Sequence, residues 1–554
     1  MAEEITVPTE EIDNFKIEFP LKLEKFQEDK LSKTFRVANS LYNRLAGISI
    51  RKFHELTNTK EYKKLETIKD KKTYFKNHGF SQYGFGSYLP FPRVGGKVKT
   101  GDDKIIKAIC GYKHFTTCGI NSKIMEQMLV NLWSAYEKKI LDNRIKVKMK
   151  PLHSSYAVSS LSVRVACHVN EKNGQILNSF AGFKVSNDFH YVDFTYDKGG
   201  EKVTDKDGNL IKKKPTILRL KLDVKQFTDY ELWALKGEIR VIALVRKKIR
   251  GKYKYYIQFA IKGEKPQRIL GKGKVGIDVG PSSVAVVAMN NGKVSCHMYP
   301  LAPEADIDEK KIKLLQRKID RSRRANNPDC FNEDGTYIRG KKIKPAYQCK
   351  NLAKLTSMLQ EARRKQSDNR KISHNLLADK ILTFGNEFVV EKNEFAGMAK
   401  RSTKTEISEK TGKFKKKKRF GKSIGNHAPA MFVTLLENKV KSFGGKFYKV
   451  NPNIAATQFD FTTQEFTKHE LKDRFIMLGD GTLHQRDLMA AFNLANVKIN
   501  DDIIVTPKNR KKIEKDINYY DLDRMGVNYR NFSNAESQFV DKVETEKILI
   551  PNFR

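Results

Sequence analysis

The stretch Lys274-Val275-Gly276-Ile277-Asp278-Val279-Gly280 places one carboxylate inside a run of strand-forming residues. A turn at 281–283 and an apolar run at 284–289 follow, so the pattern predicts two successive strands. The tripeptide at 290–292, Asn-Asn-Gly, is a hairpin signal and predicts a third strand over 294–298. An acid in a buried strand costs free energy unless a partner compensates its charge. We therefore interpret Asp278 as the first candidate ligand of a metal ion.

The composition is strongly basic, with 106 Lys and Arg against 64 Asp and Glu and a formal net charge of +42. Self-repulsion at this level favours an acidic partner, and nucleic acid is the commonest one. No apolar run approaches the ~20 residues that span a bilayer, so we expect no membrane partner. None of the six cysteines forms a CxxC pair, which indicates neither a disulfide framework nor a zinc ribbon.

The first 270 residues show β patterns, then helical patterns, then β patterns again. Residues 15–23 alternate between apolar and polar side chains, which predicts a half-buried strand. Helical spacing follows from Leu31 and again from Ser122 to Leu141, and strand patterns return near 218–224 and 238–261. This order predicts a β domain with a helical domain inserted into it.

An aromatic and glycine-rich segment, Tyr74 to Arg93, lies between the two predicted helices. We favour a small core under a long loop, and a surface that stacks on nucleic-acid bases is the alternative. As residues that read a short DNA motif, we select from this segment and its neighbourhood Tyr83, Phe85, Tyr88, Arg93 and Lys97.

Two long basic helices are predicted beyond the opening stretch, over 308–326 and 350–382. Residues 310–371 contain 19 Lys and Arg against 6 Asp and Glu, which favours a phosphate-tracking surface over an ordinary solvated face. A basic stretch within 400–422 is interpreted in the same way. The candidate nucleic-acid contacts are Arg317, Arg321, Arg323, Arg324, Lys415, Lys416, Lys417, Lys418 and Arg419.

Two further acids stand in contexts like that of Asp278. Glu391 ends an apolar strand pattern at 387–391, and Asp487 begins a helical pattern that continues through Ala490, Ala491 and Leu494. Phosphodiester hydrolysis by two divalent ions ~4 Å apart requires a carboxylate set of this kind. Hard oxygen ligands favour Mg²⁺ or Mn²⁺ over zinc.

The order of five motifs resembles the split RuvC nuclease of TnpB proteins and compact type V CRISPR effectors. The motifs are GIDVG (276–280), LLQRKIDRSRRANNPDCFNEDG (314–335), FVVEKNEF (388–395), GNHAPAMFVTLLENKV (425–440) and QRDLMAAFNLA (485–495). The resemblance covers residues 270 to about 500. It implies an RNase H-like fold in which Asp278, Glu391 and Asp487 are the catalytic, Mg²⁺-binding triad of a prokaryotic, cytoplasmic protein.

The resemblance also implies a multidomain architecture of α+β and α/β parts. A β-barrel-like wedge domain would comprise 1–26 and 151–269, with a helical recognition domain at 27–150 inserted into it. The nuclease domain would be split into 270–300, 384–451 and 484–500. The remaining segments are basic linker helices at 301–383, a target-nucleic-acid-binding loop at 452–483 and a C-terminal extension at 501–554.

One departure concerns the four-cysteine zinc ribbon that the family commonly places between its second and third acid motifs. The interval 452–481 contains no cysteine here, so we predict no zinc. His469 and His484 are the candidate soft ligands nearby, and we expect both to be surface histidines.

The function implied is an RNA-guided DNA endonuclease, in which guide pairing supplies the sequence specificity. Its partners would be a guide RNA, with or without a second trans-acting RNA, and double-stranded target DNA. The alternatives are a transposon-encoded TnpB nuclease, a guided DNA binder without cleavage, and a guide-independent resolvase or transposase of the RNase H fold. The sequence leaves the oligomeric state open.

Overall fold

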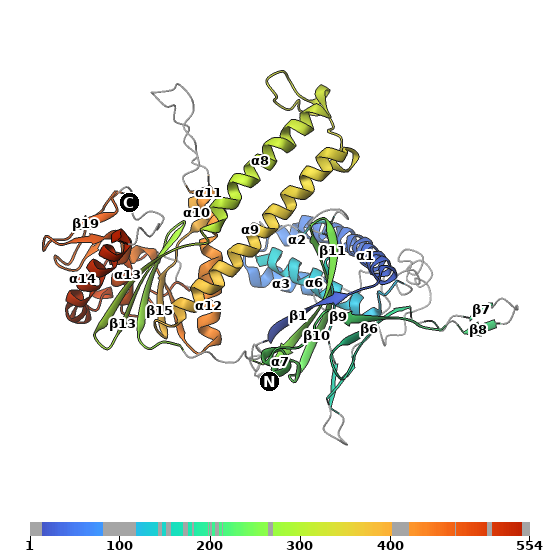
Figure 1. Cartoon of the computed structure of the whole chain (residues 1–554), viewed down its shortest axis with the longest axis horizontal. Coiled ribbons are helices and arrows are strands. Elements are labelled where there is room, and N and C mark those ends of the chain that lie inside the picture. Colours follow the sequence, from blue (N-terminus) through green and yellow to red (C-terminus); the bar gives the residue numbers. More distant parts are fainter. Residues whose placement is uncertain are drawn as a thin grey trace. The chain divides into compact units, whose positions relative to one another are not determined.

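The computed structural model describes residues 14–80, 118–141, 147–150, 157–164, 166–169, 176–179, 182–197, 199, 202–204, 210–212, 214–263, 270–400, 420–470, 473–506 and 512–545. The chain divides into two compact units, Met1–Glu264 and Lys265–Arg554. Both units combine helices with sheets, so the mixed α+β, multidomain class expected from the sequence is confirmed (Figure 1). Among the described helices, none combines the length and hydropathy that crossing a membrane requires.

A seven-stranded antiparallel sheet forms the centre of the N-terminal unit. Its strands, in spatial order, are β2 (Ser160–Arg164), β10 (Ile239–Ile249), β11 (Lys252–Lys262), β1 (Asn14–Lys22), β9 (Thr216–Leu222), β6 (Tyr191–Asp197) and β5 (Phe183–Val185). The predicted alternation in β1 is confirmed, because Phe15, Ile17, Phe19 and Leu21 are all buried. Two short hairpins accompany the sheet: β3–β4 (Ala166–Val169 and Ile176–Ser179) and β7–β8 (Lys202–Thr204 and Leu210–Lys212).

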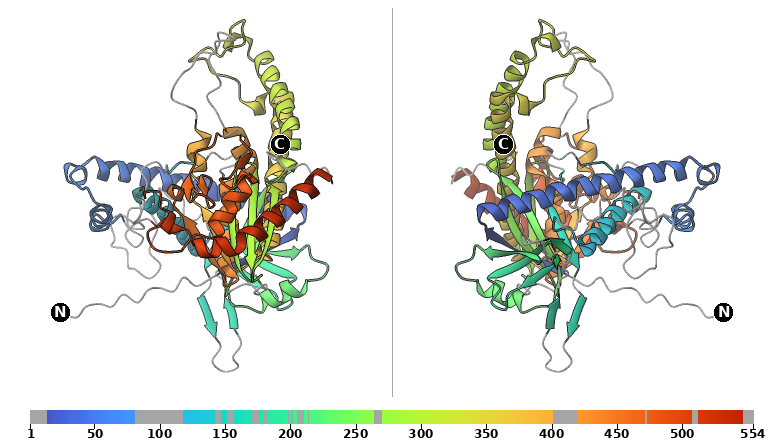
Figure 2. Two further views of the ribbon diagram at one scale, coloured as in Figure 1. Left: turned by 90° about the vertical axis from the view of Figure 1, so that its left-hand side faces the viewer. Right: turned by 90° about the vertical axis from the view of Figure 1, so that its right-hand side faces the viewer.

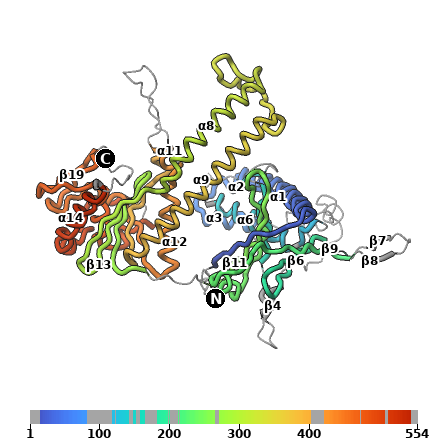
Figure 3. Tube along the Cα trace, viewed as in Figure 1, coloured from blue at the N-terminus to red at the C-terminus, as the bar shows by residue number. Residues whose placement is uncertain are grey.

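Helices interrupt this β structure between β1 and β2, as the order of sequence patterns predicts (Figure 3). The described ones are α1 (Lys25–Asn58), α2 (Lys60–Lys63), α3 (Ile68–Asn77) and α6 (Ser122–Leu141), and α7 (Asp229–Leu235) follows β9. Tyr74, Phe75 and Phe80, at the start of the aromatic segment, are buried in the core of this unit, which favours the core interpretation for that part. The five residues selected for motif reading, Tyr83 to Lys97, lie outside the described residues.

A five-stranded mixed sheet forms the centre of the C-terminal unit. Its strands, in spatial order, are β14 (Lys293–Pro300), β13 (Ser283–Asn290), β12 (Lys274–Val279), β15 (Glu387–Glu391) and β16 (Lys446–Val450). The hairpin between β13 and β14 turns at Asn291 and Gly292, with φ of 47° and 76°, as the Asn-Gly signal predicts. β12, β13 and β14 are antiparallel neighbours, whereas β15 and β16 continue from β12 in parallel.

Helices cover both faces of this sheet. On one face α13 (Arg486–Ala495) and α14 (Leu522–Thr545) share a core with Val389 of β15, and Figure 2 shows the red α14 lying across the strands. On the other face α12 (Pro429–Ser442) and the last turns of α9 (Lys350–Leu382) pack on Ile277 and Val390. Met525 and Phe532 of α14 are fully buried, so part of the predicted C-terminal extension belongs to the core of the unit.

The remaining elements connect these layers. α8 (Glu304–Ala325) packs beside α9 as a helical hairpin with its own small apolar clusters, and its tip holds η2 (Pro328–Cys330) and η3 (Ala346–Gln348). The short helices are α10 (Phe395–Ala399), α11 (Gly421–His427), η4 (Pro452–Ile454) and η5 (Ile517–Tyr519). The segment expected as a loop at 452–483 contains short strands instead: β17 (Phe459–Asp460), β18 (Glu465–Phe466), β19 (Phe475–Met477) and the first residue of β20 (Leu483–Gln485).

Gly276 in β12 allows α13 to lie directly on the sheet. A Cβ atom built at this glycine would stand 1.9 Å from the carbonyl oxygen of Ala491 and 2.5 Å from the amide nitrogen of Ala495. Both of these are backbone atoms of α13, which a side-chain rotation cannot move away. A glycine inside a strand often marks such a close backbone approach.

Replacing Gly276 by alanine should therefore push α13 off the sheet. We expect Gly276→Ala to lower the free energy of unfolding of the C-terminal unit by roughly 1–3 kcal/mol or more, as overpacking does. Gly425→Ala in α11 is the matched control, because its added Cβ would meet no atom within 4 Å. Urea unfolding of both variants provides the measurement, and equal stability of the two would contradict the assignment.

Candidate active site

Asp278 and Glu391 lie side by side at the carboxyl ends of two neighbouring parallel strands. β12 and β15 are in register up to the pair Ile277 and Val390, so the next residue on each strand is one of the two acids. Alternation places both acids on the face that α13 covers, because Ile277 and Val390 point into the opposite core. The carboxyl edge of parallel strands is where ligands bind in many α/β proteins.

Asp487 reaches the same face from the first turn of α13. Burial raises the pKa of the Asp278 carboxyl well above its usual range, and the negative charges of Asp487 and Glu391 raise it further. Arg486 and the backbone N–H of Val279 act in the opposite direction. The structure thus brings the other two sequence-predicted acids, Glu391 and Asp487, within electrostatic reach of Asp278.

Glu391 is the most deeply enclosed partner of Asp278. Burial raises the pKa of Glu391 to about 7. The fully buried Tyr520 lies near it, and burial together with the charge of Glu391 raises the pKa of Tyr520 well above its usual value. The carboxylate of Glu391 is therefore costly to ionise without a compensating cation.

A pocket of about 520 Å³ opens over two of the acids. Asp278 and Asp487 line it together with four basic side chains, Lys468, His469, Arg474 and Arg486. Sequence reasoning did not select these four residues for the site. Arg486 could have been selected from the sequence, since it precedes Asp487 in the motif at 485–495. Lys468 and Arg474 could not, because they belong to the segment expected as a loop.

Arg486 holds Asp487 in place through contacts on both sides of its guanidinium group. Its Nη2 and Nε donate to Oδ1 of Asp487 at 3.1 and 3.3 Å. Its Nη1 donates to the backbone carbonyls of Asp473 at 3.0 Å and Glu470 at 3.3 Å. Arg474 lies 3.9 Å from the other carboxylate oxygen of Asp487. The third acid is thus fixed to the segment that precedes its helix.

The donor set fits Mg²⁺ or Mn²⁺, because it consists of carboxylates whose mutual repulsion a divalent cation would relieve. Within the described ranges, however, no three His, Cys, Asp or Glu side chains are gathered closely enough to form a finished metal-binding cluster. Asp487 is engaged by Arg486, so a bound cation would compete with this guanidinium group for the carboxylate.

The structure describes only some of the residues predicted to contact nucleic acid. Arg317, Arg321, Arg323 and Arg324 are all exposed on α8, although Arg323 lies 3.6 Å from Asp320. The basic run Lys415 to Arg419 lies outside the described residues. The structure does not bring the four arginines into the pocket of the acids.

The expectation that His484 is a surface histidine is wrong. Its side chain is only 3% exposed, because Glu536 and Tyr529 of α14 enclose it. His469 is half-buried and lines the pocket. Among the described residues, Asp460 braces the strands of this segment: it accepts from the backbone N–H groups of Thr462 and Gly479, both at 2.8 Å.

The raised pKa of Glu391 predicts a pH dependence of stability in the metal-free protein. The unfolded chain releases the proton near its ordinary value of 4.5, whereas the folded chain keeps it until about 7. Stability is therefore full below pH 4.5 and falls as the pH rises towards 7, by at most about 3 kcal/mol from this group. Glu391→Gln should be more stable than the parent protein at pH 8 and should lack this part of the slope.

Chemical unfolding with EDTA between pH 4.5 and 8 measures this effect. Glu394→Gln, three residues further along and exposed, is the control and should leave the slope unchanged. A parent protein whose stability does not fall over this range relative to Glu391→Gln would contradict the burial argument.

Comparisons with known proteins give structural matches only: no family model matches the chain, and no curated protein sequence matches it. A Cas12f1–sgRNA–target DNA complex has 14% identity and a TM-score of 0.45, over 89% of this chain and 99% of that chain. A CRISPR-Cas12f ternary complex has 15% identity and a TM-score of 0.27, over 87% and 83%. The Cas12i1 R-loop complex before target DNA cleavage has 11% identity and a TM-score of 0.26, over 91% and 60%. These three structures are complexes of Cas12 proteins, which are type V CRISPR effectors.

Proposed function

We propose that this protein is an RNA-guided DNA endonuclease, a compact type V CRISPR effector that cuts with a single RuvC site. The observation that carries the proposal is the convergence of Asp278, Glu391 and Asp487 on one face of the C-terminal sheet. A chain of net charge +42 with three mutually repelling, enclosed acids suits a polyanionic substrate and a cationic cofactor.

The three acids would hold Mg²⁺ or Mn²⁺, and the bound ions would activate water and stabilise the leaving oxygen. The chain itself supplies the surroundings of this chemistry. Lys468, Arg474 and Arg486 present positive charge to the pocket, where a backbone phosphate would lie opposite the acids. Because the pKa of Asp278 is raised, occupation of the site is expected to release a proton.

The assignment of parts follows the sequence resemblance. We assign the N-terminal β structure to a wedge domain and its inserted helices to a recognition domain, which together would hold guide RNA and the guide–target duplex. The exposed arginines of α8 are assigned to contacts with the phosphate backbone. We place the protein in the prokaryotic cytoplasm on the same basis.

Three alternatives differ in testable ways. A TnpB nuclease would carry an RNA that derives from a transposon end. A guided binder would bind DNA without cutting it, but the enclosed and mutually repelling acids disfavour a site that has lost its use. A resolvase or transposase would cut branched DNA without any RNA, so unaided cleavage by RNA-free protein would overturn the guided proposal. Sequencing the RNA that co-purifies with the protein distinguishes these cases.

Replacing Asp278 by asparagine tests the catalytic assignment. The change removes the charge but keeps the shape, so we expect cleavage to fall by roughly 100-fold or more, as for loss of a metal ligand. RNA-dependent DNA binding, measured by filter retention, should remain. The control is Glu394→Gln, an exposed acid just beyond β15. Cleavage by Asp278→Asn at the parental rate would exclude this residue from the site, and loss of both binding and cleavage would make its role structural.

The exposed arginines of α8 should contribute to nucleic-acid affinity through counterion release. Arg321→Gln is expected to weaken binding and to reduce the slope of log K against log salt by about 0.7–0.9. Arg364→Gln on α9 is the control, because Arg364 already pairs with Glu361 at 2.7 Å and with Asp368 at 2.5 Å. Binding measured between about 50 and 200 mM salt decides the matter, and equal slopes for both variants would remove Arg321 from the interface.

A further inference from the structure

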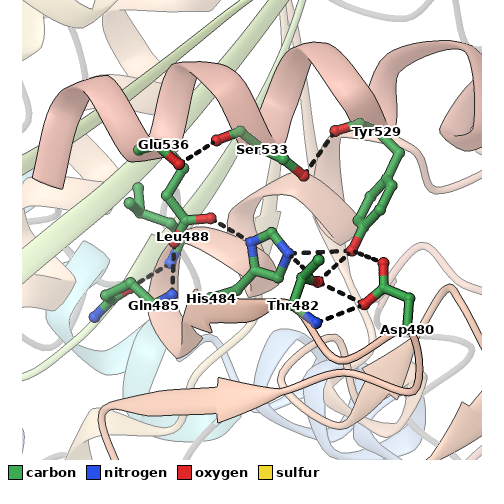
Figure 4. Close-up of polar contacts among 9 residues, drawn as sticks. Asp480, Thr482, His484, Gln485, Leu488, Tyr529, Ser533 and Glu536 are labelled. Atoms are coloured by element: carbon green, nitrogen blue, oxygen red, sulfur yellow. Dashed lines mark hydrogen bonds and ion pairs between the residues drawn. The ribbon is translucent and has the colours of Figure 1, made fainter.

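Glu536 on α14 lies beside the start of α13, the helix that carries Asp487 (Figure 4). Its side chain is only 5% exposed. One carboxylate oxygen accepts from the backbone N–H of Gln485 at 2.5 Å, and the other lies 2.5 Å from Nδ1 of His484. Both contacts fall on the two residues that immediately precede α13.

Gln485 passes this restraint on to the helix. It is the N-cap residue of α13, and its side-chain oxygen accepts from the backbone N–H of Leu488 at 2.7 Å. Gln485 is fully buried, so bulk water does not compete for these bonds. Asp487 lies between Gln485 and Leu488 in the sequence. The position of Asp487 therefore depends on the cap bond between these two residues and on the bond of Glu536 to Gln485.

His484 anchors the other side of the arrangement. Its Nε2 lies 2.9 Å from Oγ1 of Thr482 and 3.1 Å from the hydroxyl of Tyr529, which also donates to Asp480 at 3.0 Å. The imidazole ring stacks on Phe532 with ring centroids 5.4 Å apart. Three side chains of α14, Glu536, Tyr529 and Phe532, thus contact His484 of β20, the strand that leads into α13.

A buried carboxylate of this kind is costly unless its partners are well placed. Breaking one of these bonds would leave a charged or polar group buried without a partner, which costs free energy. The partners are therefore held at bonding distance. Neither Glu536 nor His484 lines the pocket of the acids, so neither would contact a substrate bound there.

We propose that Glu536 is a positioning residue that fixes Asp487 for catalysis through the Gln485 cap and the His484 contact. This inference rests on the proposed nuclease function for its catalytic meaning. It assigns to the C-terminal helix α14 a part in shaping the site, although α14 lies beyond the segment whose sequence resembles the nuclease. Residues that orient metal-binding groups typically change affinity or activity by 10–100-fold when mutated.

The test compares two substitutions of similar volume. Glu536→Met removes both acceptor oxygens, whereas Glu536→Gln keeps one for the N–H of Gln485 and offers an amide to His484. In metal-free protein we expect amide exchange over residues 483–495 to accelerate by roughly 10-fold or more in Glu536→Met only. Exchange over β10 and β11 in the other unit serves as the internal reference.

Cleavage kinetics supply the second readout. For Glu536→Met we expect kcat to fall by about 10–100-fold and the Mg²⁺ midpoint to rise, with target DNA affinity unchanged. Glu536→Gln should keep activity within about 3-fold of the parent. The control Gln538→Met, an exposed position on the same helix, should also cut at close to the parental rate. A purely structural role would instead lower the amount of active protein without moving the Mg²⁺ midpoint.

The outcomes separate the two proposals. Unchanged exchange at 483–495 in Glu536→Met, or an unchanged Mg²⁺ midpoint, would overturn the positioning role. If Glu536→Met does not fold, Gln485→Met tests the cap through which Glu536 is proposed to act, because it removes the bond to Leu488 and keeps both bonds of Glu536. Unchanged exchange at 486–495 and an unchanged Mg²⁺ midpoint in Gln485→Met would then overturn the proposed route. If the parent protein cuts no DNA, the proposed function fails, and the exchange measurement still decides whether Glu536 fixes the start of α13.

Discussion

The backbone contact between α13 and β12 at Gly276 is the constraint on which the C-terminal unit depends. With a side chain at this position, the helix could not approach the sheet to the observed separation. The contact aligns the first turn of α13 with the end of β12, so Asp487 comes within electrostatic reach of Asp278. The apolar residues around it, including Val389, Leu488 and Ala491, are fully buried and hold the two layers together. The absence of a side chain at Gly276 thus allows the close packing that brings Asp487 towards Asp278.

The acids at this junction are kept at a cost to the metal-free fold. Burial disfavours the ionised forms of Asp278 and Glu391, and repulsion from Asp487 and Glu391 adds to this for Asp278, where Arg486 offsets part of it. The acids that the proposed function requires therefore lower the stability of the metal-free fold, a trade-off that is common where a site needs charge in a poorly solvated place. The basic side chains that line the pocket also suit an anionic substrate.

The segment between Glu391 and Asp487 shows how a chain without ribbon cysteines can order this region. Asp460 satisfies backbone groups of the short strands, and His484 with Glu536 fastens the last of them to α14. Fully satisfied hydrogen bonds to buried carboxylates restrain local geometry strongly, because an unpaired buried polar group is costly. Tyr520 and Phe532 provide this packing, which explains why α14 lies within the core.

The local elements and the identity of the acids can be predicted from the sequence alone. Apolar runs and turn residues predict β12 to β15, the helices α6 and α9, and the positions of Asp278, Glu391 and Asp487, because these signals act over a few residues. Which side chains meet depends on how these elements pack. The parallel pairing of β12 with β15, the bonds of Arg486 to Glu470 and Asp473 and the bond of Glu536 to Gln485 join separate parts of the chain. No local pattern encodes such pairs, since they arise when separate elements bury their apolar faces against one another.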